Sequence, residues 1–175
     1  MIPHPASLPQ MAEARAKENS QFRLFLKRQT RLSSQEVDHL VFRLESKVWQ
    51  RIDCTTCANC CRHVAPMLGE DDVARLAGHL GLSNADFIAR YLDKAQEAGP
   101  SPPWIVRELP CPFLKDSRCT VYEHRPGTCR DYPYLSKPDF TFRTLAMMER
   151  LADCPAVFEA WEDLKRATGF RHRPT

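Results

Sequence analysis

Four of the eight cysteines in this 175-residue chain lie in one short run, Cys54-Thr55-Thr56-Cys57-Ala58-Asn59-Cys60-Cys61. The C-x-x-C spacing lets two sulfurs turn onto one metal ion, because the two intervening residues close a tight turn. Three cysteines at this spacing also supply three ligands of a [4Fe–4S] cluster, whose fourth thiolate often comes from a distant Cys-Pro. The run therefore predicts a metal centre around which the rest of the chain folds.

The other cysteines lie downstream, at Cys111, Cys119, Cys129 and Cys154. Cys111 and Cys154 are each followed by proline, the local form of a distant cluster ligand. Neighbouring side chains diverge, so Cys60 and Cys61 are expected to serve different centres or opposite sides of a shared one. Eight cysteines are enough either for two four-thiolate sites or for one iron–sulfur cluster with additional thiols. Cys154 has a second interpretation, as a buried residue at the start of a helix.

Nearby histidines and arginines are weaker candidates for the same centre. His63 and His124 lie close to the cysteines and could replace a thiolate, although a hydrogen bond to a ligand is the more common role. Arg125 and Arg130 are placed to offset the negative charge that a four-thiolate centre carries.

Composition narrows the class of protein. Apolar residues make up 43% of the chain, and the net charge is only +3. No stretch approaches the ~20 apolar residues of a membrane span, so a membrane protein is excluded. A chain of this length can bury a core without disulfides. Residues 1–7 lack the basic and apolar regions of a secretory signal, which predicts a cytoplasmic protein with reduced thiols.

Local patterns predict a mainly α fold with a small β-hairpin, formed as a single cysteine-rich domain with a metal at its centre. Ser33 and Glu36 form a capping box that begins a helix reaching about residue 51. Further helices are expected over residues 11–32, 70–80, 83–92 and 155–168, and the hairpin strands over residues 104–109 and 120–122. The expected organisation is a flexible arm (1–10), a helical extension (11–53), a cysteine-cluster metal-binding domain (54–169) and a basic tail (170–175).

The ordered motifs resemble the YkgJ-like cysteine-cluster family, a zinc- or iron-chelating domain. The matching motifs are Cys54-x-x-Cys57-x-x-Cys60-Cys61, Cys111-Pro112-Phe113-Leu114, Cys119-Thr120-Val121-Tyr122-Glu123-His124-Arg125-Pro126 and Cys129-Arg130-Asp131-Tyr132-Pro133. The resemblance spans roughly Cys54 to Cys154 and leaves the N-terminal helices outside. It implies that all eight cysteines are ligands of zinc or of an iron–sulfur cluster.

The predicted function is metal binding with a structural or sensor role. No nucleophile–base pair and no phosphate-binding glycine loop is present, which favours a protein that is not an enzyme. An iron–sulfur enzyme or accessory factor in protein modification is the alternative, since related clusters occur in flagellin lysine methylases. The hypothesis of a nucleic-acid adaptor has weaker support, because it depends only on a basic first helix and the tail Arg171-His172-Arg173. A metal ion is the expected partner, and a protein partner is compatible with these features.

Overall fold

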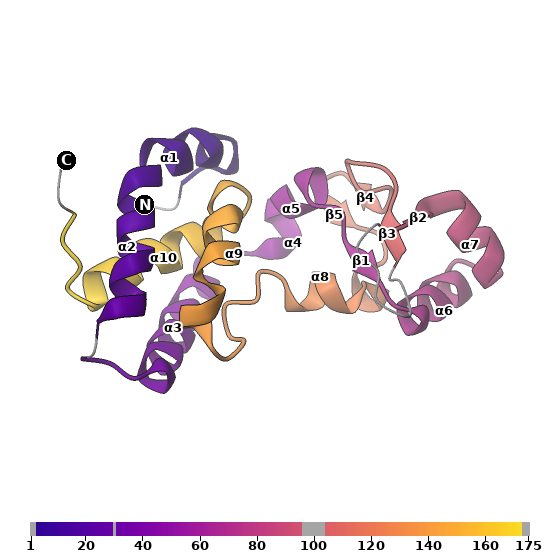
Figure 1. The fold of residues 1–175 in the computed structure, drawn as a ribbon. Helices are drawn as coiled ribbons and strands as arrows, with labels where there is room; N and C mark the ends of the chain where they lie inside the picture. The colour runs from indigo at the N-terminus through magenta and orange to yellow at the C-terminus, as the bar shows by residue number, and fades with distance from the viewer. Residues whose placement is uncertain (1–2, 30, 96–103, 173–175) are drawn as a thin grey trace. The chain divides into compact units, whose positions relative to one another are not determined.

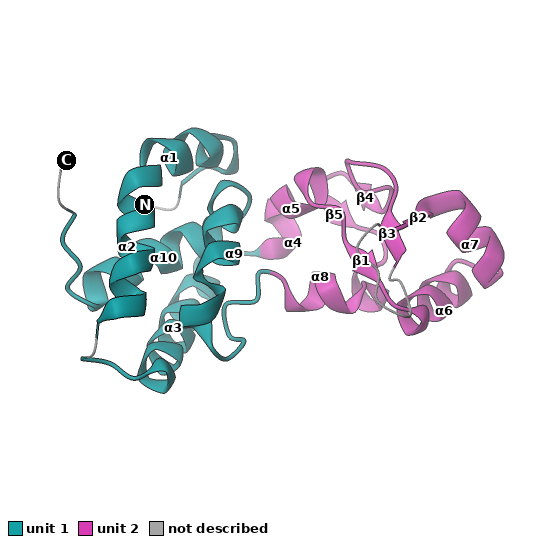
Figure 2. Cartoon of the chain, viewed as in Figure 1, with its two compact units in different colours: residues 1–53, 133–175 teal, residues 54–132 magenta. Residues whose placement is uncertain are grey.

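The computed structural model describes residues 3–29, 31–95 and 104–172, and divides the chain into two compact units (Figure 2). Unit 1 comprises Met1–Asp53 and Pro133–Thr175, and unit 2 comprises Cys54–Tyr132. The fold is mainly α with small β elements, as predicted. Residues 133–169 were expected to belong to the cysteine-cluster domain, whereas in the structure they pack with the N-terminal helices.

Unit 1 is helical. Its elements are η1 (Pro5–Ser7), α1 (Leu8–Ala14), α2 (Ala16–Arg28), α3 (Ser34–Trp49), η3 (Phe140–Arg143), α9 (Thr144–Glu149), η4 (Arg150–Ala152) and α10 (Pro155–Ala167). Trp161 of α10 is almost fully buried, and its ring meets Phe22 of α2 edge-on at 5.1 Å. The Trp161 indole N–H donates to the side-chain oxygen of buried Asn19 at 3.0 Å. α10 therefore carries the centre of the unit 1 core.

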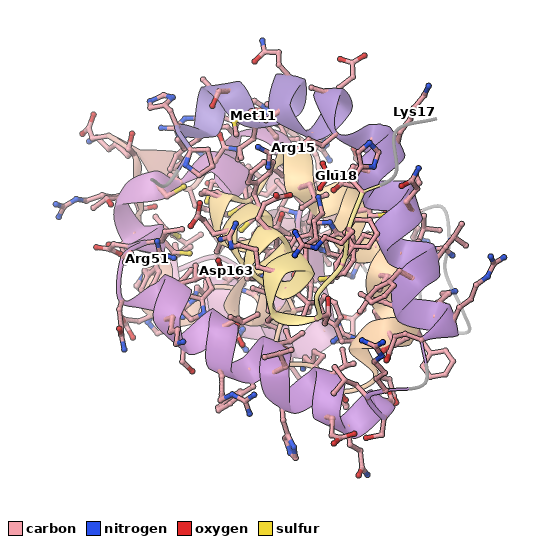
Figure 3. The ribbon with its side chains drawn as sticks, turned by 90° about the vertical axis from the view of Figure 1, so that its left-hand side faces the viewer. Met11, Arg15, Lys17, Glu18, Arg51 and Asp163 are labelled. Carbon is pink, nitrogen blue, oxygen red and sulfur yellow. The ribbon has the colours of Figure 1, made fainter. Side chains whose placement is uncertain are left out.

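Charged side chains also join α2 to α10. Arg15 and Glu18 lie at the start of α2 and are directed towards α10 (Figure 3). Arg15 pairs with Glu162 at 2.8 Å, while Lys165, whose side chain is 5% exposed, pairs with Glu18 at 2.9 Å and with Glu162 at 2.8 Å. Burial of the lysine in such a network requires both carboxylates, since an unpaired buried charge is costly.

The sequence predicted α3 correctly and the first helix only in part. The Ser33 hydroxyl accepts from the Glu36 N–H at 3.2 Å, and the Glu36 carboxylate accepts from the Ser33 N–H at 2.8 Å, which completes the capping box. The helix expected over residues 11–32 is divided at Arg15 into α1 and α2, and α2 ends at Arg28. Of the expected flexible arm, residues 5–10 lie in η1 and α1, and Leu8 is fully buried.

Unit 2 combines short helices with two small antiparallel sheets (Figure 1). Its helices are α4 (Cys54–Cys57), α5 (Asn59–His63), α6 (Glu70–His79), α7 (Asn84–Tyr91), η2 (Tyr122–His124) and α8 (Gly127–Asp131). Its strands are β1 (Met67–Leu68), β2 (Leu92–Lys94), β3 (Trp104–Val106), β4 (Leu114–Lys115) and β5 (Arg118–Cys119). The first sheet has the order β1-β3-β2, and β4 pairs with β5. A core led by Leu68, Leu76 and Phe87 packs α6 and α7 against these strands.

A hairpin is present, but its strands differ from the predicted ones. β4 and β5 pair Leu114 with Cys119 and Lys115 with Arg118. The two residues between them, Asp116 and Ser117, both have positive φ, which is the conformation of a tight two-residue hairpin turn. The chain therefore reverses earlier than expected, and Tyr122 begins a 3-10 helix instead of ending a strand. The predicted strand over residues 104–109 is confirmed only as the shorter β3.

Candidate metal centre

The cysteine run forms two short helical turns with a sharp break between them. α4 carries Cys54 and Cys57 at its ends, and α5 carries Cys60 and Cys61. Buried Ala58 between them adopts a left-handed conformation with φ of 48°. Cys54 is exposed and the other three are half-buried.

Backbone contacts bring Cys111 and Cys119 beside this run. The Cys111 N–H donates to the carbonyl oxygen of Cys61 at 2.8 Å, which fixes the segment before the hairpin against α5. The Leu114 N–H then donates to the Cys111 carbonyl at 2.9 Å, and the β4–β5 pairing sets Cys119 opposite Leu114. Cys111 and Cys119 both pack against the apolar core of unit 2.

Cys129 is supplied by α8, a helix of five residues. The Thr128 hydroxyl donates to the carbonyl oxygen of Met67 at 2.7 Å and so ties α8 to β1. Burial, reinforced by the charges of Cys111, Cys61 and Cys119, raises the pKa of the Cys129 thiol to about 12. The charges of three other cysteines therefore disfavour ionisation of Cys129.

The charges of other cysteines also act on Cys111 and Cys119. Burial is the main cause that raises the pKa of Cys111 to about 11, and the charges of Cys61 and Cys119 add to it. Burial and the charge of Cys61 also raise the pKa of Cys119. Thiols repel one another's ionised forms in this way when they are neighbours. We call Cys61, Cys111, Cys119 and Cys129 the four-cysteine cluster.

Two arginines offset charge at this cluster. A hydrogen bond from Cys60 is the main cause that lowers the pKa of Cys61 to about 7, and the charge of Arg62 contributes. Arg125 lowers the pKa of Cys119 and of Cys129, against the larger effect of burial. Sequence reasoning proposed Arg125 for this role but missed Arg62, although a basic residue directly after Cys61 was the available signal.

Both arginines are held in place by further contacts. Arg62 donates to the carbonyl oxygen of Cys57 at 3.0 Å and to the Ser117 hydroxyl at 2.7 Å, so it joins α4 to the hairpin turn. Arg125 lies over the Tyr122 ring, 3.8 Å from its centre, and donates to the Tyr122 carbonyl at 2.7 Å.

The donor set of the cluster suits zinc or iron. Thiolate sulfur is the preferred ligand of structural zinc and of iron–sulfur clusters. Among the described residues, no group of three or more His, Cys, Asp or Glu side chains is placed to hold a metal ion. No disulfide joins any two of the cysteines, all eight of which the structure describes.

The remaining predicted ligands lie in two other places. Cys54, Cys57 and Cys60 belong to the adjoining turns α4 and α5 of the same unit. Cys154 belongs to unit 1, is 6% exposed, and is the residue from which α10 begins. His124 stacks on His79 with ring centres 4.0 Å apart. The assignment of all eight cysteines as ligands stays a prediction.

Comparison with known proteins gives the family. Residues 53–155, which include all eight cysteines, match the family model CxxCxxCC, described as a putative zinc- or iron-chelating domain. The chain belongs to the CxxCxxCC family. The resemblance predicted from the motifs is thereby confirmed, and metal binding is the general function that the family description gives the CxxCxxCC domain. No curated protein and no solved structure matches the chain. Within the described residues, no helix is long and apolar enough to cross a membrane.

Proposed function

We propose that this CxxCxxCC domain binds a zinc ion or an iron–sulfur cluster through the four-cysteine cluster, and that the bound metal has a structural or sensor role. The observation that supports the proposal is the hydrogen bond from the Cys111 N–H to the Cys61 carbonyl oxygen at 2.8 Å, beside which the charge of Cys61 raises the pKa of Cys111, Cys119 and Cys129. It comes from residues that are far apart in sequence, so it reflects the fold and is independent of the C-x-x-C spacing.

A structural role follows from the type of ligand. Four thiolates fill the coordination of zinc and leave no position for water or substrate, which is typical of structural sites. The cluster draws on α5, the segment before the hairpin, β5 and α8, and these elements are short. A bound metal would cross-link four such elements and thereby stabilise unit 2.

The iron–sulfur alternative uses the same residues in a different way. Cys60 directly precedes Cys61 in α5, so the C-x-x-C-x-x-C run adjoins the four-cysteine cluster. A cluster could accordingly take ligands from both groups. Either metal requires reduced thiols, which is why we place the protein in the cytoplasm.

Metal analysis combined with a visible spectrum tests the proposal. Full-length protein purified without oxygen is expected to contain metal in a fixed ratio to protein. A colourless zinc protein supports the structural site, whereas absorption near 400 nm indicates the iron–sulfur alternative.

Single variants test the ligand set. Cys119→Ser and Cys129→Ser are expected to lose the metal, and Cys54→Ser is the control from the same unit that keeps it. Cys154→Ala is a second control, because that residue is a core position of unit 1. Full metal content in Cys129→Ser would contradict the four-cysteine site. Loss of metal in Cys54→Ser would indicate that the ligands include cysteines of the Cys54–Cys61 run.

A further inference from the structure

The segment that leads into Cys129 is held by two side chains of α6. It runs from η2 to the start of α8 and also carries Arg125, the cation beside the thiols. Arg75 donates from Nε to the carbonyl oxygen of His124 at 3.3 Å and from Nη2 to that of Arg125 at 3.2 Å. The Asp72 carboxylate accepts from the Gly127 N–H at 3.2 Å.

Asp72 and Arg75 act as one unit. They lie one helical turn apart and form an ion pair, with side chains 16% and 33% exposed. Asp72 Oδ1, which receives the Gly127 N–H, is also the atom that pairs with Arg75. The carboxylate thus orients the guanidinium towards the two carbonyl oxygens, and the α6 helix presents both groups to the segment.

α8 depends on this support because it is too short to fix its own position. It has five residues, and Pro126 at its N-cap provides no capping side chain. The N–H groups of a first helical turn have no partner within the helix, and for Gly127 the partner is Asp72. Thr128 holds the helix to β1 on another side. The position of Cys129 is therefore set by α6 and β1 together.

We propose that Asp72 and Arg75 are positioning residues for the metal centre. They hold residues 124–127 and thereby set the positions of Arg125 and Cys129. This inference rests on the proposed function, because it concerns how the same four thiols are arranged. Groups that orient metal ligands typically change metal affinity by about 10–100-fold when they are removed.

Arg107 provides a matched control within unit 2. It pairs with Asp93 at 2.9 Å and donates to the carbonyl oxygens of Ala89 at 3.1 Å and Leu92 at 2.7 Å. It thus makes the same kinds of contact as Arg75, one carboxylate and backbone carbonyls, but it supports the end of α7 and β2. A purely structural role for Arg75 predicts that both arginines behave alike.

The experiment compares Arg75→Met with Arg107→Met in the full-length chain. Metal-free protein is titrated with zinc alone, in competition with a coloured chelator, without oxygen. Arg75→Met is expected to weaken zinc binding by about 10–100-fold, and Arg107→Met is expected to bind like the wild type. Asp72→Asn keeps an oxygen for the Gly127 N–H and is expected to fall between the wild type and Arg75→Met.

A second readout uses no metal. The rate at which iodoacetamide alkylates Cys129 in metal-free protein, measured by peptide mass spectrometry against Cys57, is expected to rise in Arg75→Met only. Equal zinc affinity in the two methionine variants, or an unchanged Cys129 rate, overturns the positioning role. If the wild type itself fails to bind metal, the proposed function fails, while the alkylation rates still decide whether Arg75 positions Cys129.

Discussion

Removal of the metal is expected to make unit 2 unfold at a much lower denaturant concentration than unit 1. Unit 2 spans residues 54–132, close to the size of about 70–80 residues at which a single apolar core rarely supplies more than about 3–5 kcal/mol. A structural zinc site of four protein ligands contributes about 10–16 kcal/mol. The metal is therefore expected to supply most of the free energy of unfolding of unit 2. At about 3 kcal/mol per molar guanidinium chloride, losing about 10 kcal/mol lowers the midpoint by about 3 M.

Tryptophan fluorescence can follow the two units separately. Trp104 lies on β3 of unit 2, where its indole N–H donates to the Glu70 carboxylate at 3.1 Å, while Trp49 and Trp161 belong to unit 1. Denaturation is measured with and without a chelator, and metal content is checked in parallel. The fluorescence transition whose denaturant midpoint falls on chelation should disappear in Trp104→Phe and persist in the control Trp49→Phe. An unmoved Trp104 transition in protein proven to be metal-free would refute the reasoning.

Three further predictions concern unit 1. Asn19→Ala leaves the buried Trp161 N–H without its acceptor and should cost about 1–3 kcal/mol in denaturant unfolding; a stability equal to the wild type would contradict the observed hydrogen bond. Lys165→Met should lower the free energy of unfolding by less than the about 3–5 kcal/mol that breaking a fully buried ion pair costs, because Glu162 still pairs with Arg15. The Lys165→Met/Glu162→Gln double variant should lose less stability than the sum of the two single variants. Hydrogen bonds from Ser33 lower the pKa of Glu36 in the folded protein. The stability that the ionised Glu36 carboxylate adds is therefore fully present above the pKa of Glu36 in the unfolded chain, and it is lost as the pH falls through the lower pKa of the folded protein. The wild type should therefore exceed Glu36→Gln in unfolding midpoint at neutral pH, and the two midpoints should converge in acid.

Local signals in the sequence were sufficient for elements that carry their own boundaries. The capping box of Ser33 and Glu36 began α3 at the right residue, and the Ser83 hydroxyl caps α7 by accepting from the Asp86 N–H at 3.1 Å. The two-residue strand β1 gave no comparable signal, because so short a segment shows no alternation. The return of residues 133–175 to unit 1 was also hidden, since packing of α10 against the N-terminal helices is a contact between distant segments.

In the candidate site too, local sequence signals were informative and contacts between distant segments were not predictable. Spacing drew attention to the Cys54–Cys60 run, and the chain did place these cysteines on consecutive short turns. The four-cysteine cluster depends instead on the hydrogen bond from Cys111 to Cys61 and on the hairpin that sets the position of Cys119. The hydrogen bond from Cys111 to Cys61 joins residues 50 positions apart, so no spacing rule could predict it.

The two Cys-Pro dipeptides show why a motif needs its structural context. Cys111 precedes Pro112, and its N–H binds the carbonyl of Cys61, a member of the same cluster. Cys154 precedes Pro155, and there the proline occupies the first turn of α10, where a missing N–H has no cost. The Cys154 carbonyl accepts from the Phe158 N–H at 3.0 Å, as the residue before a helix ordinarily does. The two dipeptides thus differ in the backbone partner of the cysteine: Cys111 is joined to another cysteine, whereas Cys154 begins a helix.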